Sequence, residues 1–190
     1  MDKAKGEMKS QLDRSAWINA AIELLADDGL DGIRVEVLAK RLHVTKGSFY
    51  WHFKDRQDLL EAVLDTWRQG RIRDILKQTR ADPGREQDRL YHVIDVYSAS
   101  RNRKGIRIEL ALRDWARRDP AAAAVVQEVD AVRFETARKL FLARGLSRDE
   151  ASCRCMLLYA YVFGQSLLNC QRIDVDPVSL KERIADLITG

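Results

Sequence analysis

Cysteine, proline and long apolar runs are all scarce in this chain, and each absence excludes a class of protein. The three cysteines among 190 residues, at Cys153, Cys155 and Cys170, form an odd number that argues against a closed disulfide framework. No run approaches the ~20 apolar residues of a membrane span, and the amino terminus lacks the apolar region of a signal peptide. The sequence therefore predicts a cytoplasmic protein with no membrane association, whose thiols are buried in a core.

Motifs for catalysis and cofactor binding are missing as well. The chain has no glycine-rich phosphate loop, no nucleophile elbow and no metal-ligand cluster. Its three histidines, His43, His52 and His92, have no serine or cysteine partner at motif spacing. The sequence therefore predicts neither an enzyme nor a cofactor or metal site.

The three prolines indicate helix starts, because each of them follows an aspartate. Aspartate is a favourable N-cap and proline fits the first helical position, so helices are predicted to begin near residues 83, 120 and 177. Ser147 and Glu150 form a capping box that opens a further helix over 148–171. Apolar stripes at helical spacing predict two more helices, over 12–28 and 55–80.

One passage, 106–112, alternates apolar residues with other residues at the period of a strand. The same passage also fits a helix, because Ile108, Leu112 and Trp115 share one helical face and most of their neighbours are strong helix formers. Since no partner strand is visible elsewhere, we favour the helix. The predicted fold class is all-α, with about nine helices.

The segment 35–60 predicts a helix-turn-helix. Val35, Leu38 and Leu42 fall on one apolar stripe of a first short helix. His43 tolerates the positive φ that ends such a helix, and Thr45 is a suitable N-cap for the next. A short helix, a tight turn and a second short helix are the layout of a DNA-reading motif.

The second of these helices separates core residues from surface residues. Phe49 and Phe53 are four apart and can attach the helix to a core, which leaves Tyr50, Trp51 and His52 for the outer surface. Small and hydrogen-bonding residues at its start suit close approach to base edges and phosphates. The alternative is that the aromatic run forms an ordinary helix–helix contact.

The run TKGSFYWHFKDRQDLL, which begins at Thr45, resembles the DNA-binding signature of the TetR (tetracycline-repressor-like) family of bacterial regulators, and the resemblance extends over residues 14–64. It implies that 45–52 is a recognition helix, that Tyr50 and His52 contact phosphates, and that Lys54 steadies the DNA backbone. His43 stands where the family usually has glycine. The DNA-binding residues predicted on this basis are Arg34, Val35, Thr45, Lys46, Gly47, Ser48, Tyr50, Trp51, His52 and Lys54.

The distribution of charge supports a nucleic-acid partner. The net charge of the whole chain is only +4, but six basic residues and two acidic residues lie within 34–56. A local basic surface attracts a phosphate backbone. We therefore predict a DNA-binding domain over 11–54 and a helical regulatory and dimerisation domain over 55–190.

The predicted helix at 148–171 has apolar residues on two neighbouring stripes, which indicates burial on two sides. The predicted last helix has an apolar face of its own. In a protein that resembles TetR regulators, one side of such helices would meet a second subunit. The predicted homodimer interface comprises Leu157, Tyr161, Gly164, Leu168, Leu180, Ile184 and Leu187.

The resemblance also implies a small-molecule pocket in the larger domain, because members of the family usually carry one. The aromatic residues in question could equally be core, and the Arg113–Asp130 pair could be a salt bridge. The predicted ligand-binding residues are Trp67, Tyr97, Arg113, Trp115, Asp130, Phe134 and Tyr159.

These features together predict a dimeric, sequence-specific transcriptional regulator that binds a palindromic operator in double-stranded DNA. We expect a repressor that a small-molecule effector releases from its operator. The alternative is a DNA-binding protein with the same amino-terminal domain that a partner protein controls, or that acts without a ligand. The sequence does not distinguish between these two forms of control.

Overall fold

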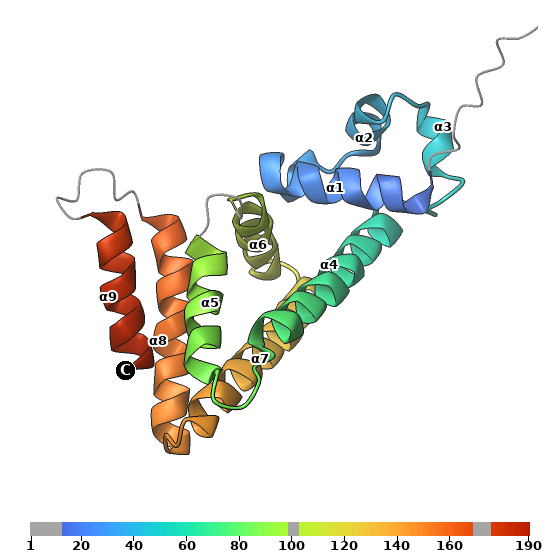
Figure 1. The fold of residues 1–190 in the computed structure, drawn as a ribbon. Coiled ribbons are helices and arrows are strands. Elements are labelled where there is room, and N and C mark those ends of the chain that lie inside the picture. Colours follow the sequence, from blue (N-terminus) through green and yellow to red (C-terminus); the bar gives the residue numbers. More distant parts are fainter. Residues whose placement is uncertain (1–12, 99–102, 169–175) are drawn as a thin grey trace, which may run out of the picture. The chain divides into compact units, whose positions relative to one another are not determined.

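The computed structural model describes residues 13–98, 103–168 and 176–190, and within these ranges it contains nine α-helices, one short 3-10 helix and no strand (Figure 1). The predicted all-α fold class is confirmed. The chain divides into two compact units, one ending at Thr66 and the other beginning at Trp67. We call the first unit the head and the second the body. The boundary falls within helix α4, Arg56–Thr79.

The head consists of α1 (Arg14–Asp28), the 3-10 helix η1 (Leu30–Gly32), α2 (Val35–Arg41), α3 (Lys46–Phe49) and the first turns of α4. Its core is apolar: Trp17 and Phe49 are fully buried and meet edge to face, with ring centroids 5.4 Å apart. Phe53 stacks on Phe49 at 5.2 Å. The two phenylalanines predicted to face the core therefore do so.

The turn between α2 and α3 has a left-handed residue at its centre. His43 adopts φ 56° and is the one non-glycine residue with positive φ among the described residues. The amide of Val44 donates to the carbonyl oxygen of Ala39 across this turn. Thr45 holds the N-cap position of α3 with extended backbone, but its side chain makes no capping hydrogen bond, so the predicted role of that side chain is wrong.

The body contains the rest of α4 together with α5 (Glu86–Ser98), α6 (Arg103–Ala116), α7 (Pro120–Ala143), α8 (Arg148–Leu167) and α9 (Pro177–Thr189). Helix α7 packs against α5, α6 and α8, while α9 packs against α5 and α8. The passage with strand-like alternation lies in α6 and is helical. The core of the body comprises Leu90, Ile94, Phe141, Leu158 and Val162 among others.

Two of the three Asp-Pro pairs begin helices as predicted. Asp119 accepts hydrogen bonds from two backbone amides at the start of α7, and Asp176 accepts one from the amide of Ser179 at the start of α9. Ser147 caps α8 in the same way. The prediction of a helix start near residue 83 is wrong, because Gly84 adopts φ 83° and turns the backbone away from a helix, so that α5 begins three residues later.

The prediction of buried thiols holds for one cysteine and is wrong for another. Cys155 is fully buried, whereas Cys153 is exposed, because residues two apart on a helix point to different sides. Cys170 lies outside the described residues. No helix within the described ranges is long and apolar enough to cross a membrane.

Candidate nucleic-acid interface and body cavities

The outer surface of α3 and of the turn after it carries large side chains that the core leaves exposed. Trp51 is 84% exposed and Tyr50 is 56% exposed. Lys46 and Gly47 are exposed on the first turn of α3. A methyl group in place of the Gly47 hydrogen would have the Thr45 hydroxyl oxygen at 3.8 Å as its nearest neighbour, so the surface above Gly47 is open. This surface can reach a groove of a nucleic acid.

Most of the predicted DNA-binding residues therefore lie at the surface of the head. Ser48 and His52 are half-buried, while Val35 is buried in the core with 9% exposure. The Val35 side chain is thus unavailable, and only its backbone at the start of α2 remains for a phosphate. The residues that are exposed are Arg34, Thr45, Lys46, Gly47, Tyr50, Trp51 and Lys54.

Two arginines stabilise the backbone of the head around this surface. The Arg14 guanidinium lies 4.5 Å from the Phe53 ring centroid, donates to the His52 carbonyl oxygen at 3.4 Å and pairs with Asp58 at 3.0 Å. Arg56 donates to the carbonyl oxygens of Ile33 at 2.6 Å and Leu30 at 2.8 Å. Both side chains are therefore structural.

An acidic residue on α2 partly neutralises the recognition surface. The Lys46 ammonium lies 2.5 Å from a carboxylate oxygen of Glu36, and both side chains are more than half exposed. This hydrogen bond, with the charge of Lys46, lowers the pKa of Glu36, and the same contact raises the pKa of Lys46. A phosphate that binds Lys46 must therefore compete with Glu36.

A cavity of about 290 Å³ lies in the body between α6, α7 and α8. It brings together four of the seven predicted ligand-binding residues. It is lined by Arg113, Asp130, Arg133, Phe134, Met156, Tyr159, Ala160 and Phe163. Sequence reasoning had missed Arg133, Met156 and Phe163.

Three of the lining residues, Arg113, Asp130 and Arg133, belong to a network of charged side chains that extends behind the cavity. Glu109 has no exposed surface and accepts hydrogen bonds from Arg113 at 2.9 Å and from Arg133 at 3.1 Å. The Nε of Arg71, on α4, lies 3.2 Å from the same carboxylate. Asp130 pairs with both Arg113 and Arg133. Burial by itself lowers the pKa of Arg113, but the hydrogen bond to Asp130 and the charge of Glu109 outweigh it and raise that pKa.

Two tyrosines contact Arg133, and one of them, Tyr159, also lines the cavity. The Tyr97 hydroxyl oxygen accepts from the Arg133 Nε at 3.1 Å, and the Tyr159 hydroxyl donates to the Arg133 carbonyl oxygen at 3.1 Å. Burial is the main cause of the strongly raised pKa of Tyr159, which keeps its hydroxyl protonated. The arginines of this wall are therefore held in place by neutral as well as charged partners.

The other three predicted ligand-binding residues, Trp67, Tyr97 and Trp115, do not line the cavity. Trp115 is 1% exposed and donates its indole N–H to Asp119 at 3.0 Å, so it supports the cap of α7. Trp67 is 8% exposed in the core. Glu109 and Arg133 were missed, although the sequence contains a signal for them. Each is a charged residue on an otherwise apolar stripe of its helix, which indicates a buried charge.

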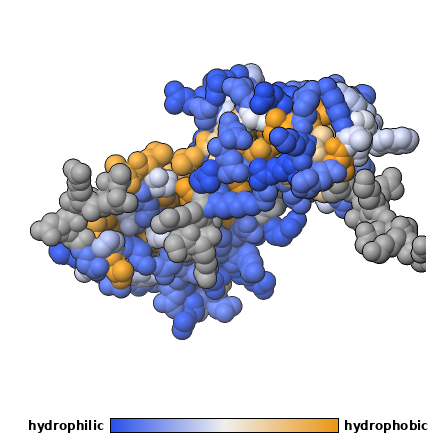
Figure 2. Space-filling model, turned by 90° about the horizontal axis from the view of Figure 1, so that it is seen from above, coloured by the Kyte–Doolittle hydropathy of each residue, from blue (hydrophilic) through white to orange (hydrophobic). Residues whose placement is uncertain are grey.

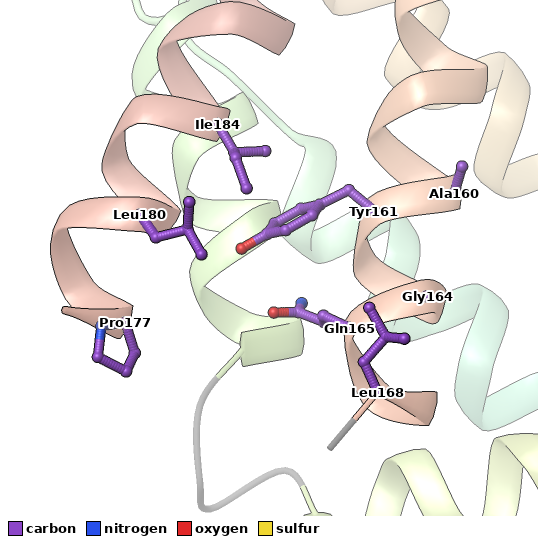
Figure 3. A pocket seen from close by; sticks show the side chains of 8 residues that line it. All are labelled: Ala160, Tyr161, Gly164, Gln165, Leu168, Pro177, Leu180 and Ile184. Atoms are coloured by element: carbon purple, nitrogen blue, oxygen red, sulfur yellow. The ribbon is translucent and has the colours of Figure 1, made fainter. Parts of the chain in front are cut away.

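A second hollow, of about 420 Å³, is an apolar groove between α8 and α9 (Figure 3). In the close view, Tyr161 of α8 and Leu180 of α9 point toward each other across it. Five of the seven residues predicted for the dimer interface line the groove: Tyr161, Gly164, Leu168, Leu180 and Ile184. The other two, Leu157 and Leu187, are 54% and 78% exposed.

The buried face of α8 differs from both apolar stripes that the sequence pattern singles out. Ala151, Cys155, Leu158 and Val162 face the body core. The two neighbouring stripes keep large apolar groups at the surface, including Met156 and Leu167. Figure 2 shows hydrophobic residues at the surface of the body on its left side, which is the side of α8 and α9 in Figure 1.

The geometry of the head defines a helix-turn-helix protein of the DNA-binding class. Residues 18–63 match the family described as bacterial regulatory proteins, tetR family. The chain is 29% identical to the class G tetracycline repressor of Vibrio anguillarum over 177 residues, which cover 93% of this chain and 75% of that protein. It is 43% identical over 56 residues to the class C tetracycline repressor of Escherichia coli, a match covering 30% of this chain.

Solved structures share the fold along nearly the whole chain. A transcriptional regulator from Saccharomonospora viridis, solved in complex with choline, superposes with a TM-score of 0.74 at 17% identity, covering 92% of this chain and 94% of that one. A TetR-family regulator from Rhodococcus sp. gives a TM-score of 0.68 at 21% identity, covering 93% and 98%.

Residues 18–63 carry the amino-terminal domain of the tetR family of bacterial regulatory proteins, and the chain is similar to a member of that family along most of its length. The resemblance noted for residues 14–64 is confirmed, and these relatives are regulators rather than enzymes. The matches to the class C, D and H tetracycline repressors span about a quarter of the length of those proteins.

Proposed function

We propose that this chain acts in the cytoplasm as a dimeric, sequence-specific repressor that binds a palindromic operator and leaves it when a small molecule binds the body. The observation that carries the proposal is the exposed surface of α3 and the turn after it, where Lys46, Tyr50 and Trp51 are exposed and the surface above Gly47 is open. A tryptophan that is 84% exposed has no packing role in the head. The buried Trp17–Phe49 contact holds that surface in place.

Within this surface the roles divide between positioning and reading. Tyr50, His52 and Lys54, together with Arg34, would contact phosphates, which set register but carry no sequence information. Thr45, Lys46, Ser48 and Trp51 would face the major groove, where donors and acceptors differ between base pairs. Gly47 would allow the backbone to approach the DNA closely.

The exposed apolar surface of α8 and α9 supports dimerisation. Large apolar side chains are rarely left in contiguous exposed patches of a monomer. Two-fold pairing of these helices would bury Leu157, Leu187 and the α8–α9 groove. A dimer would present two reader helices to half-sites separated by about one helical turn, ~34–36 Å.

The cavity between α6, α7 and α8 supports control by a ligand. Its volume of about 290 Å³ suits a small organic molecule, and charged groups lie next to apolar ones on its walls. A ligand that binds one conformation of the body more tightly shifts the population toward it. Since α4 runs from the head into the body, a change in the body can alter the spacing of two heads in a dimer.

The first test is selection of bound sites from random duplex DNA by the purified protein at near-physiological salt. The proposal expects a palindrome with half-sites about one helical turn or more apart. The same experiment with Trp51→Ala and Lys46→Ala should return altered preferences, whereas Tyr50→Ala should weaken binding to all sequences.

The result that contradicts the proposal is an unchanged affinity of all three variants for the selected site. Recovery of no motif, with weak binding that is steeply sensitive to salt, would mean that the head binds phosphates without reading sequence. Control by a partner protein instead of a ligand would follow if a palindrome is recovered but no small molecule releases the protein from it.

A further inference from the structure

The cavity between α6, α7 and α8 has an excess of positive charge on its polar wall. Arg113, Arg133 and Asp130 line the cavity, and Glu109 and Arg71 are paired within the same network behind them, which gives three arginines against two carboxylates. Outside this network, Arg138 lies 6.0 Å from the Phe134 ring and is paired with Glu135, so that pair adds no net charge. The wall therefore carries one positive charge that its own acidic residues do not neutralise.

The hydrogen-bonding capacity of the wall is unbalanced in the same direction. Both oxygens of Asp130 accept from Arg113, and one of them also accepts from Arg133. Both oxygens of Glu109 are likewise engaged by arginine. By contrast, the buried Nε–H of Arg113 has no acceptor among the residues that the structure describes. A molecule entering this cavity therefore meets a spare donor, while the two carboxylates are already occupied.

The aromatic ring at the centre of the cavity already has cations against it. The Arg113 guanidinium lies 4.4 Å from the Phe163 ring centroid, and that of Arg133 lies at 5.1 Å. A positively charged ligand normally uses such a ring face and a nearby carboxylate. In this cavity it would instead be placed against two guanidinium groups, which disfavours it by charge repulsion.

We propose that the cavity binds a small organic anion, with its carboxylate or equivalent acidic group at Arg113 and its apolar body against Phe134, Met156 and Phe163. The charge-assisted hydrogen bond to a guanidinium gives the orientation, and the apolar lining accommodates the rest of the molecule. As an effector this anion deepens the proposed function, but its binding is a property of the body alone and is tested without DNA.

The test compares three probes of one size that differ in charge: benzoate, benzyl alcohol and benzylammonium. Each is titrated by calorimetry into the full-length protein. The proposal expects benzoate to bind at one site per chain, benzyl alcohol to bind at least about ten-fold more weakly, since a hydrogen bond to a charged group contributes about 1.5–3 kcal/mol, and benzylammonium to give no saturable heat.

Substitutions that remove a positive or a negative charge from the wall should change the affinity for benzoate in opposite directions. Arg113→Gln removes the spare donor and the net positive charge, so benzoate affinity should fall about ten-fold or more. Asp130→Asn removes a carboxylate and should raise benzoate affinity. Arg113→Lys keeps the charge but loses the planar guanidinium with its paired donors. Its affinity for benzoate should lie between that of Arg113→Gln and that of the unmodified protein. The matched control is Arg85→Gln, because Arg85 is exposed and pairs only with Asp88 at 2.6 Å.

Thermal unfolding of each variant shows whether the body is intact. The proposal is overturned if benzylammonium binds as tightly as benzoate, if a folded Arg113→Gln variant binds benzoate unchanged, or if none of the three probes binds. Site selection from random DNA is independent of these outcomes. Benzoate binding without a recovered palindrome would therefore support the anion site and contradict the proposed repressor. A recovered palindrome without benzoate binding would support the repressor and contradict the anion site.

Discussion

The head and the body place their polar groups in opposite positions. In the head, an apolar core around Trp17 and Phe49 leaves Lys46 of α3, and Tyr50 and Trp51 just after it, at the surface. In the body, Glu109 and Arg133 are paired and buried between α6 and α7, and Arg133 lines a cavity. A surface suits a large, extended partner such as DNA, whereas a partly enclosed polar wall suits a small molecule.

The difference also teaches where each unit is vulnerable. Removing a surface group of the head should change binding and leave folding unaffected. Removing a member of the buried network should change folding and ligand binding together, because a buried charge without its partner is costly. The following changes test that contrast in order of decreasing expected effect.

The largest effect should come from Phe49→Ala. Phe49 is fully buried between Trp17 and Phe53, so its loss leaves a cavity and should cost about 3–5 kcal/mol of the free energy of unfolding of the head. Hydrogen exchange of the full-length protein should show loss of protection in 13–66 while the body helices keep theirs. Equal loss of protection in both units would contradict the division.

Glu109→Ala should destabilise the body by about 3 kcal/mol, because three arginines then lose a fully buried carboxylate. Denaturant unfolding measures the change. Glu128→Ala is the control, since Glu128 forms a largely exposed pair with Arg68 at 3.1 Å and its loss should cost at most about 1 kcal/mol. Similar values for the two variants would show that the buried network contributes no more than a surface pair.

His43→Gly should stabilise the head by up to about 1 kcal/mol, because glycine adopts the φ of 56° without the steric cost that a side chain meets there. The gain is limited by the greater freedom of glycine in the unfolded chain. Denaturant unfolding followed by hydrogen exchange in 35–49 measures it. A loss of stability would mean that the His43 side chain makes a compensating contact.

The smallest effect is expected from Glu36→Gln, which removes the carboxylate that holds Lys46. Lys46 would then meet a phosphate or base without competition, and DNA affinity should rise by about two- to three-fold, since an exposed ion pair is weak. Titration of a selected DNA site at two salt concentrations measures this change. The control is Glu61→Gln, an exposed carboxylate on α4 that bonds to Gln57.

The sequence by itself determined the helix-turn-helix, because every signal for it is local. The apolar stripe of α2, the turn residue His43 and the phenylalanines four apart lie within twenty residues of one another, and each acts on its immediate backbone. Even so, Thr45 holds its predicted N-cap position without a side-chain hydrogen bond, and no helix begins at Pro83.

Only the tertiary structure decided the cavity. Arg133 meets Glu109 across 24 positions of sequence and Tyr97 across 36, and such meetings depend on how α5, α6 and α7 pack. The spacing of apolar residues shows that a charged residue lies on an apolar face of its helix, but it does not show which oppositely charged residue will pair with it. For the same reason α8 was expected to be buried along stripes that it leaves partly exposed, since a helix with apolar groups around most of its circumference does not indicate which face the body covers.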